Sequence, residues 1–369
     1  MKIGFDGKRA EHNTSGLGNY SRDVIRGLCM HAPENEYVLY SPKEGAEFDF
    51  GDERLVRRYP TRWKDQLTPA LWRRKGIVDD LKNEGIDLYH GLSNELPSGI
   101  EAIGTRSIVT IHDLIFERFP DYYKGIDRMI YRSKTKEACA SADHIIAISE
   151  QTKKDLVEFY SVSTEKISVV YQTCHPGFQK EVKSETLEQV RSGYQLPSRY
   201  VLQVGTLEPR KNVLRSLEAV SKIEDLHIAF VGRQTDHQKL IERRVQSLGI
   251  GGRVHFLQDV PVAFLPALFK GATASLYPSL FEGFGLPIIE SLFQGTPVVT
   301  NKEGCFKEAA GSYGYYADVQ DPSSIADALS RAVEQGALKE GLEGHLSQFT
   351  LEATTHRLLE VYQQVVKNR

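Results

Sequence analysis

A short stretch in the second half of the chain carries two carboxylates around a glycine-rich turn. It runs from Pro278 to Glu290, and Glu282 and Glu290 flank the turn. An apolar run before it indicates a buried strand and helical spacing after it indicates a helix, so the turn opens a helix. The free backbone N–H groups of such a turn favour the binding of a phosphate group. The two carboxylates stand too far apart for one metal, but they can hold hydroxyls at both ends of a nucleotide sugar. Without wider support, Glu282 is equally explained as a helix cap and Glu290 as a solvated helix residue.

Two adjacent cations follow another apolar strand, at residues 200–205. They are Arg210 and Lys211, just before a helix that we expect Asn212 to cap. A departing diphosphate gains negative charge as its bond to the sugar breaks, and fixed cations stabilise that charge without a metal. In an arbitrary loop, two basic residues would carry little meaning.

A histidine and a glycine pair in the first half also stand where ligands bind. His112 stands at the carboxyl end of the apolar strand 107–111, and ligands gather at the carboxyl ends of strands in open α/β sheets. A lone histidine is otherwise a packed or capping residue. Gly16 and Gly18 form a candidate phosphate-binding loop. The alternative is that the two glycines only permit the backbone conformation of a surface turn. They fit a dinucleotide fingerprint poorly, because they do not follow the strand directly and the next strand ends in Ser41 instead of an acid.

The string from Pro278 to Glu290 resembles, nearly residue for residue, the paired-glutamate motif of a large retaining glycosyltransferase family. That family includes sucrose synthase and many bacterial mannosyl- and glucosyltransferases. Segment 206–212 resembles the family's diphosphate-binding loop, and 112–120 resembles its histidine-containing loop. The likeness covers almost the whole chain and is densest from 200 to 300. Segment 301–308 departs from it, because the family more often has small residues and a proline there.

The resemblance implies the GT-B fold, in which two doubly wound Rossmann-like α/β domains face each other across a cleft. Alternating strands and helices in both halves agree with this fold class. We expect an acceptor-side domain at 1–178, a linker at 179–196 and a nucleotide-sugar domain at 197–350. The terminal helix, 351–369, is expected to cross back to the first domain.

The resemblance also assigns roles to individual residues. The expected catalytic residues are His112, Arg210, Lys211 and Glu282. Glu282 is expected to hold hydroxyls of the donor sugar and Glu290 those of the ribose. The expected donor-binding residues are Gly16, Gly18, Gly205, Thr206, Gly283, Phe284, Gly285, Leu286 and Glu290.

Composition excludes several other classes of protein. The chain has 369 residues, 40% hydrophobic and 26% charged, with a net charge of −3, so no basic field argues for nucleic acid. The four cysteines form no Cys-x-x-Cys pair, which favours a reducing compartment over a zinc site or disulfides. No apolar run is long enough to span a membrane, and we expect a cytoplasmic protein.

Residues 53–75 combine eight basic residues with two acids and both tryptophans, Trp63 and Trp72. Such a stretch can contact lipid headgroups at the inner membrane surface or hold a pyrophosphate-linked acceptor. A solvated helix face over a packed tryptophan is the alternative that we favour. We expect this helix to continue to Glu84.

The expected activity is a hexosyl transfer from a nucleotide sugar to a glycan or a lipid-pyrophosphate-linked acceptor. The resemblance implies retention of configuration through a front-face displacement. No Asp-x-Asp follows an apolar strand, so we expect neither a metal nor a cofactor. The loop 111–116 looks most like bacterial mannosyltransferases, which makes GDP-mannose the first donor and a UDP-hexose the second. A sugar-nucleotide epimerase or a non-catalytic nucleotide-sugar binder on the same fold is the alternative.

Overall fold

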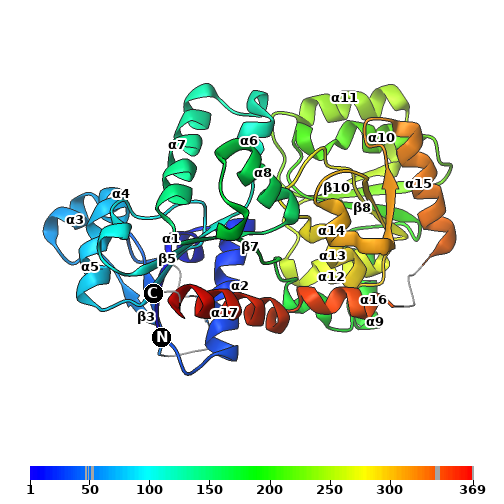
Figure 1. The fold of residues 1–369 in the computed structure, drawn as a ribbon. Helices are drawn as coiled ribbons and strands as arrows, with labels where there is room; N and C mark the ends of the chain where they lie inside the picture. Colours follow the sequence, from blue (N-terminus) through cyan, green and yellow to red (C-terminus); the bar gives the residue numbers. More distant parts are fainter. Residues whose placement is uncertain (46–47, 49, 51–53, 337–340, 368–369) are drawn as a thin grey trace. The chain divides into compact units, whose positions relative to one another are not determined.

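The chain divides into two compact units. The computed structural model describes residues 1–45, 48, 50, 54–336 and 341–367. The first unit comprises Met1–Thr173 with Thr350–Arg369, and the second comprises Cys174–Phe349. Each is an α/β unit built on one parallel sheet (Figure 1).

The sheet of the first unit has seven strands in the order β3-β2-β1-β4-β5-β6-β7, and every pairing is parallel. The strands are β1 (Lys2–Asp6), β2 (Glu36–Tyr40), β3 (Val56–Arg58), β4 (Leu88–Gly91), β5 (Arg106–Ile111), β6 (His144–Ala147) and β7 (Ile167–Val169). The helices and helical turns are α1 (Lys8–His12), α2 (Gly16–His31), α3 (Trp63–Leu67), α4 (Pro69–Leu71), η1 (Trp72–Gly76), α5 (Ile77–Asn83), η2 (Ile100–Ala102), α6 (Ile115–Arg118), η3 (Pro120–Tyr122), α7 (Gly125–Ser141), α8 (Glu150–Tyr160), η4 (Thr164–Lys166) and α17 (Leu351–Lys367).

The second unit repeats this topology with six parallel strands in the order β10-β9-β8-β11-β12-β13. Its strands are β8 (Tyr200–Val204), β9 (His227–Val231), β10 (Val254–Leu257), β11 (Ala274–Tyr277), β12 (Val298–Asn301) and β13 (Gly314–Ala317). Its helices and helical turns are η5 (Pro176–Gln179), α9 (Ser184–Gly193), η6 (Pro209–Lys211), α10 (Val213–Ser221), α11 (Gln238–Leu248), η7 (Gly251–Arg253), η8 (Val262–Phe264), α12 (Leu265–Gly271), α13 (Leu286–Phe293), α14 (Phe306–Ala310), η9 (Gly311–Tyr313), α15 (Pro322–Gln335), α16 (Leu342–Leu346) and η10 (Ser347–Phe349).

Both sheets follow the doubly wound strand order, so the expected fold class of two Rossmann-like α/β units is confirmed. In each unit the chain starts in the middle of the sheet, moves to one edge, and then crosses back to build the other side. The reversal falls between β1 and β4 in the first unit and between β8 and β11 in the second. Ligand crevices of open α/β sheets form at such switch points, outside the carboxyl ends of the strands.

Two strands and one helix break were not expected from the sequence. β3 and β13 are short edge strands, at Val56–Arg58 and Gly314–Ala317, and they lack the apolar run that marks a central strand. The expected helix to Glu84 is broken into α3, α4, a π-helical turn and α5. Pro69 starts α4, because proline is tolerated in a first turn but not in a helix interior.

The terminal helix α17 belongs to the first unit and packs across α2 (Figure 1). Gly27 of α2 permits this close approach, because a Cβ atom there would lie 2.2 Å from Thr355 Oγ1. The Tyr362 hydroxyl hydrogen-bonds His90 Nδ1 at 2.5 Å, at the carboxyl end of β4. Segment 179–196, expected as a linker, lies within the second unit, where α9 packs against α12 and its Val190 is buried.

Candidate active site

The two cations of the second unit lie in the connection that leaves β8. Gly205 follows β8 with φ 139°, a conformation that favours glycine, and turns the chain towards η6. A Cβ atom at Gly205 would lie 3.3 Å from Lys211 Cε, so the lysine side chain passes directly over this turn. Arg210 and Lys211 therefore stand at the switch point of the sheet. Thr206 lies partly exposed in the same turn.

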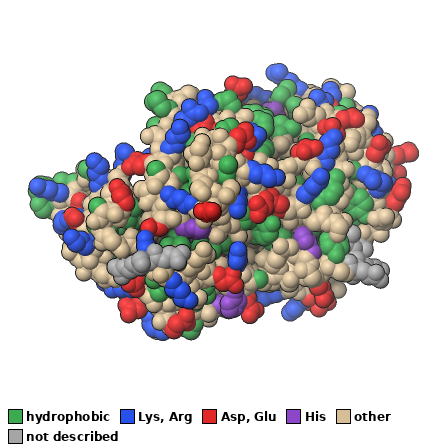
Figure 2. All heavy atoms as spheres, in the orientation of Figure 1, with side chains coloured by type: hydrophobic (Ala, Val, Ile, Leu, Met, Phe, Trp, Pro, Cys, Tyr) green, Lys and Arg blue, Asp and Glu red, His purple; other side chains and the backbone are tan. Residues whose placement is uncertain are grey.

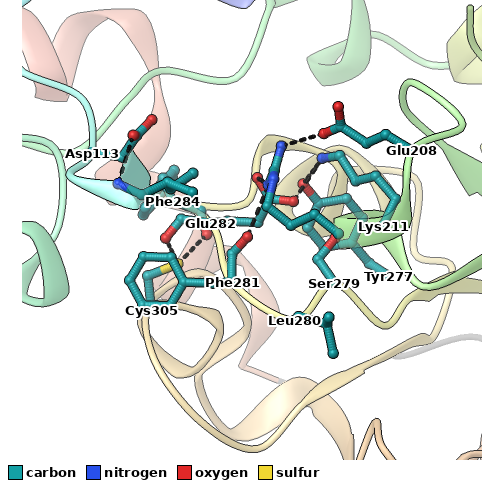
Figure 3. A network of polar contacts seen from close by, with 12 residues as sticks. Asp113, Glu208, Lys211, Tyr277, Ser279, Leu280, Phe281, Glu282, Phe284 and Cys305 are labelled. Atoms are coloured by element: carbon teal, nitrogen blue, oxygen red, sulfur yellow. Dashed lines mark hydrogen bonds and ion pairs between the residues drawn. The ribbon is translucent and has the colours of Figure 1, made fainter. Parts of the chain in front are cut away.

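Glu282 joins this cation pair from the loop that follows β11 (Figure 3). Its Oε1 lies 2.7 Å from Lys211 Nζ and its Oε2 lies 2.5 Å from Arg210 Nη1. Arg210 also donates to the Phe281 carbonyl at 2.8 Å and to Glu208 Oε1 at 2.7 Å. The glutamate thus clamps two cations that are far from it in sequence.

Electrostatics fix the charges of this cluster. Burial alone would raise the pKa of the Glu282 carboxyl, but the charges and hydrogen bonds of Lys211 and Arg210 lower it to about 2. Burial alone would lower the pKa of the Lys211 ammonium, but Glu282 raises it above its ordinary value. All three groups are therefore charged at neutral pH.

Tyr277 and Cys305 also support this cluster, although no motif in the sequence points to either residue. The Tyr277 hydroxyl accepts a hydrogen bond from Lys211 Nζ at 2.9 Å, and the ammonium lies 4.9 Å from the tyrosine ring centre. The Cys305 thiol donates to the carbonyls of Glu282 at 3.2 Å and Phe284 at 2.7 Å. Tyr277 ends a buried strand and Cys305 lies in the segment that departs from the family pattern, so only the fold reveals their roles.

Asn212 does not cap α10 as expected. Its backbone is left-handed, with φ 58°, and its side chain makes no capping hydrogen bond. Instead, Nδ2 donates to the carbonyls of Pro278 at 3.2 Å and Val319 at 2.6 Å. Asn212 therefore ties the cation loop to the loop after β11.

The glycine turn opens α13 as the sequence predicts. Gly285 is the N-cap residue, with φ 145°, and the helix starts at Leu286. Gly283, Phe284 and Gly285 are buried, and Leu286 is partly exposed. The turn and the Glu282 clamp are consecutive in the chain.

Glu290 contrasts with Glu282. It lies inside α13, is partly exposed, and has no hydrogen bond or ion pair to any described residue. Burial raises the pKa of its carboxyl to about 7. A carboxyl group without a partner at the base of a glycine turn is free to bind ligand hydroxyls.

In the first unit, His112 directly follows β5 and is 5% exposed. Its Nε2 donates to the Leu92 carbonyl at 2.9 Å, and its Nδ1 accepts from Gln172 Nε2 at 3.4 Å. Burial lowers the pKa of the imidazole to about 4, so the ring is neutral at pH 7. The ring packs edge-on against Tyr20, with centroids 4.6 Å apart.

Gly16 and Gly18 lie in the first turn of α2, not in a loop. Neither glycine has a positive φ, so both fit in a helix, and α2 begins at Gly16 instead of after the two glycines. A Cβ atom at Gly18 would lie 1.8 Å from the Asn13 carbonyl oxygen, so Gly18 has a packing role. Gly16 is exposed, with nothing within 4 Å of its Cβ position.

Among the described residues, the ligand atoms of His31, Glu352 and His356 could hold a metal ion, since they lie within 4.8 Å of one another. They belong to α2 and α17, whereas the cation clamp belongs to the second unit. No helix within the described ranges is long and apolar enough to cross a bilayer. Of the two tryptophans, Trp72 is 1% exposed and donates to Asp80 Oδ2 at 2.7 Å, whereas Trp63 is 67% exposed.

The clamp lies at the switch point of a Rossmann-like sheet, where ligands of open α/β sheets bind. Two family profiles match the chain. Residues 14–174 match Glycosyltransferase Family 4, and residues 186–343 match Glycosyl transferases group 1. The chain belongs to these glycosyltransferases and is itself a glycosyltransferase of the GT-B type.

Similar proteins agree with this assignment. O-antigen chain mannosyltransferase B of Escherichia coli is 26% identical over 98% of this chain and 99% of its own length. O-antigen chain mannosyltransferase RfbU of Salmonella typhimurium LT2 is 28% identical over 62% of this chain and 60% of its own.

Solved structures share the fold at lower identity. Anabaena HepE in complex with UDP and glucose has a TM-score of 0.75 and 18% identity, covering 99% of this chain and all of its own. Sucrose-phosphate synthase from Thermosynechococcus elongatus has a TM-score of 0.74 and 19% identity over the full length of both chains.

Proposed function

We propose that this glycosyltransferase transfers mannose from GDP-mannose to a glycan or lipid-pyrophosphate-linked acceptor, with retention of configuration and without a metal. The observation that carries the proposal is the clamp of Arg210 and Lys211 on Glu282, at the switch point between β8 and β11. The two cations are held in place before any ligand binds, so little reorganisation is needed when charge develops on a leaving diphosphate.

The proposed chemistry follows from the charges. The bond between the anomeric carbon and the diphosphate oxygen breaks, and Arg210 and Lys211 stabilise the negative charge of the departing group. The departing phosphate oxygen takes the proton of the acceptor hydroxyl, which bonds to the same face of the sugar. Glu282 fixes both cations and offers its remaining acceptor capacity to the donor sugar.

Other expected donor contacts have a physical basis in the second unit. The Glu290 carboxyl accepts hydrogen bonds from the ribose hydroxyls, because it has no partner among the described residues. The backbone from Gly283 to Leu286 leads into the N-terminus of α13 and binds sugar and phosphate oxygens, which the positive end of the helix dipole favours.

We propose two roles for the first unit, one for the start of α2 towards the donor and one for His112 towards a sugar hydroxyl. The start of α2, where Gly16 is exposed and Gly18 is buried, offers N–H groups to the donor diphosphate. His112 is neutral, so it contacts a sugar hydroxyl without adding charge to the site.

The mannose donor is supported by the two similar O-antigen mannosyltransferases. A UDP-hexose is the second candidate, since HepE, a structural neighbour, was solved with UDP and glucose. Thermal-shift screening with GDP-mannose, UDP-glucose, UDP-galactose and ADP-glucose distinguishes them. We expect the largest stabilisation from GDP-mannose, with or without EDTA, and stabilisation by none of these donors would refute the proposal.

Two further assays test the chemistry. Proton NMR of the product formed from GDP-mannose should show the α-anomer, because the configuration of the donor is retained. Products formed from the donor without an acceptor should show hydrolysis at most, whereas an epimerised nucleotide sugar would identify an epimerase.

A lipid-linked acceptor is supported by the surface of α3 and α4. Trp63, Leu67 and Leu71 are 67%, 73% and 54% exposed, beside the basic residues Arg62 and Lys64. Figure 2 shows hydrophobic and basic side chains together over this part of the first unit. An apolar and basic surface of this kind suits a layer of anionic headgroups. Sedimentation with anionic vesicles should be lost on Trp63→Ser and kept on Trp72→Phe.

A further inference from the structure

Three side chains with metal-ligating atoms meet where α2 ends and α17 begins. His31 is the last residue of α2, and Glu352 and His356 lie in the first two turns of α17. One ring nitrogen of each histidine and one carboxylate oxygen of the glutamate lie within 4.8 Å of one another. The group therefore offers two nitrogens and one oxygen to a single ion.

The packing of the two helices positions these side chains. Gly27 lies one turn before His31 on α2, and a Cβ atom there would lie 2.2 Å from Thr355 Oγ1 of α17. One turn beyond this close approach, the ring centroids of His31 and His356 are 6.0 Å apart. Glu352 and His356 are four residues apart, so they project from one face of α17 on successive turns. All three ligands are thus carried by packed helices, which hold a site more precisely than loops do.

The separation of the ligand atoms suits a tetrahedral ion. Bonds of about 2.0–2.1 Å from zinc to its ligands place neighbouring ligand atoms about 3.4 Å apart. His356 Nε2 lies 3.8 Å from Glu352 Oε1, which is close to that separation and too long for a hydrogen bond. The three atoms therefore need only small side-chain rotations to surround one ion.

The three side chains are also uncommitted and accessible. Among the described residues, no hydrogen bond joins any of them to another side chain, and their polar contacts are the ring pair and the long ion pair with one another. The side chains of His356 and Glu352 are 59% and 70% exposed, and His31 is partly exposed. An ion can therefore reach the group from solvent without breaking a bond within the protein.

The donor set selects the class of ion. Imidazole nitrogens bind zinc, copper and nickel, whereas magnesium and calcium require oxygen ligands. Three protein ligands leave a fourth position for water. Spacing along the chain gives no sign of such a site, because His31 and the two ligands of α17 come from opposite ends of the sequence.

We propose that His31, Glu352 and His356 bind a divalent transition-metal ion of the zinc class, which cross-links α2 to the start of α17. The chain returns from the second unit to the first at Thr350, so the ion fixes the first two turns after this return. All three ligands belong to the first unit, whereas the proposed transfer uses the cation clamp of the second. The ion is therefore structural, and the inference does not depend on the proposed donor chemistry.

Isothermal titration of the untagged full chain with zinc chloride tests the proposal, after bound metal has been stripped with EDTA and the EDTA removed. We expect one ion per chain and a rise in melting temperature on loading, because the ion binds the folded state. Magnesium chloride should give neither.

The ligand variants are His31→Ala, Glu352→Gln and His356→Ala. Each should weaken zinc binding by at least about tenfold, since even the loss of a group that only orients a metal ligand has an effect of that size. Without metal, each variant should melt like the metal-free wild type, because these side chains hydrogen-bond no other described side chain.

The matched controls are His237→Ala and Glu360→Gln. His237 is a partly exposed histidine of the second unit, and Glu360 pairs with Arg357 on α17 at 2.6 Å. Both controls should bind zinc like the wild type. Hydrogen exchange then locates the ion, because zinc should slow exchange at the start of α17 in the wild type but not in His31→Ala.

Three results would overturn the proposal. The first is a folded wild-type chain that gives neither binding heat nor a shift in melting temperature with excess zinc. The second is equal zinc affinity in the wild type and all three ligand variants, which would mean an adventitious ion bound elsewhere. The third is zinc binding that leaves hydrogen exchange at the start of α17 unchanged.

Discussion

Glu282 and Glu290 flank the same glycine turn, but their surroundings differ. Glu282 is 9% exposed, pairs with two cations, and has a pKa lowered to about 2. Glu290 has no partner among the described residues, and burial raises its pKa to about 7. The first carboxylate is committed to organising the protein's own cations, and the second is available to a ligand. Two identical side chains in one motif therefore have different chemistry, because different strands surround them.

The largest effect is expected from Lys211→Ala, which removes one of the two cations paired with Glu282. Turnover should fall by on the order of a hundredfold or more, the scale of losing a group that stabilises transition-state charge. The measurement is initial-rate kinetics with the donor found by thermal shift. Lys302→Ala is the matched control, because Lys302 forms an exposed ion pair with Asp318 at 3.1 Å in the same unit. Near-normal turnover of Lys211→Ala would remove the proposed role of the clamp.

Glu282→Gln should leave the Lys211 ammonium without a counter-charge and Arg210 with Glu208 alone, and it should lower the free energy of unfolding by about 3 kcal/mol. The folded pKa of Glu282, about 2, lies below its ordinary value of 4.5. Its stabilisation is therefore fully present above pH 4.5 and is lost as the pH falls towards 2. Urea unfolding of both proteins at several pH values should show the gap closing in that window. A gap that stays constant with pH would contradict the ion-pair account.

Glu290→Gln should have the opposite pH dependence. The folded pKa of about 7 lies above the ordinary value of 4.5, so the wild-type carboxyl favours the folded state below pH 4.5 and loses this contribution as the pH rises through 7. The variant should gain stability relative to wild type across that range, by up to about 3 kcal/mol.

Nucleotide binding provides a second measurement at Glu290. Because the carboxylate form accepts hydrogen bonds from ribose hydroxyls, wild-type affinity should rise between pH 5.5 and 8, on the order of tenfold. Titration calorimetry at both ends of the range checks this. The same pH dependence in Glu290→Gln would show that Glu290 does not bind the nucleotide.

The smallest effect is expected from Cys305→Ala. The thiol donates to the Glu282 and Phe284 carbonyls, so its loss should loosen the backbone between the two glutamates and cost about 1 kcal/mol of stability. The expected fall in turnover is at most about tenfold. Cys139→Ala, at a buried thiol of the first unit, is the comparison for the loss of side-chain volume alone. An equal loss of turnover in both variants would show that the thiol hydrogen bonds do not matter.

Periodicity predicted most of the fold. Apolar, β-branched runs such as Ile108–Ile111 are buried on both faces of a parallel sheet, so they are visible in the sequence. β3 and β13 were missed because edge strands need no such run. The single helix expected to continue to Glu84 was wrong, because Pro69 starts a separate helix and divides the segment into shorter ones.

The candidate site was predicted as a set of residues but not as a set of contacts. Arg210, Lys211 and Glu282 were expected near a donor, but nothing indicated that the glutamate binds both cations. Tyr277 and Cys305 carry no motif, so their contacts with the cluster cannot be recognised from the sequence.

The sequence by itself determined the strand and helix alternation, the glycine turn at Gly285 and the presence of two carboxylates and two cations after apolar strands. These features depend on neighbouring residues and on backbone preferences. The tertiary structure decided which charges meet. Parallel pairing of β8 and β11 brings Lys211 to Glu282, and the same packing leaves Glu290 without a partner. A pKa depends on burial and on nearby charges in space, and the spacing along the chain does not specify either of them.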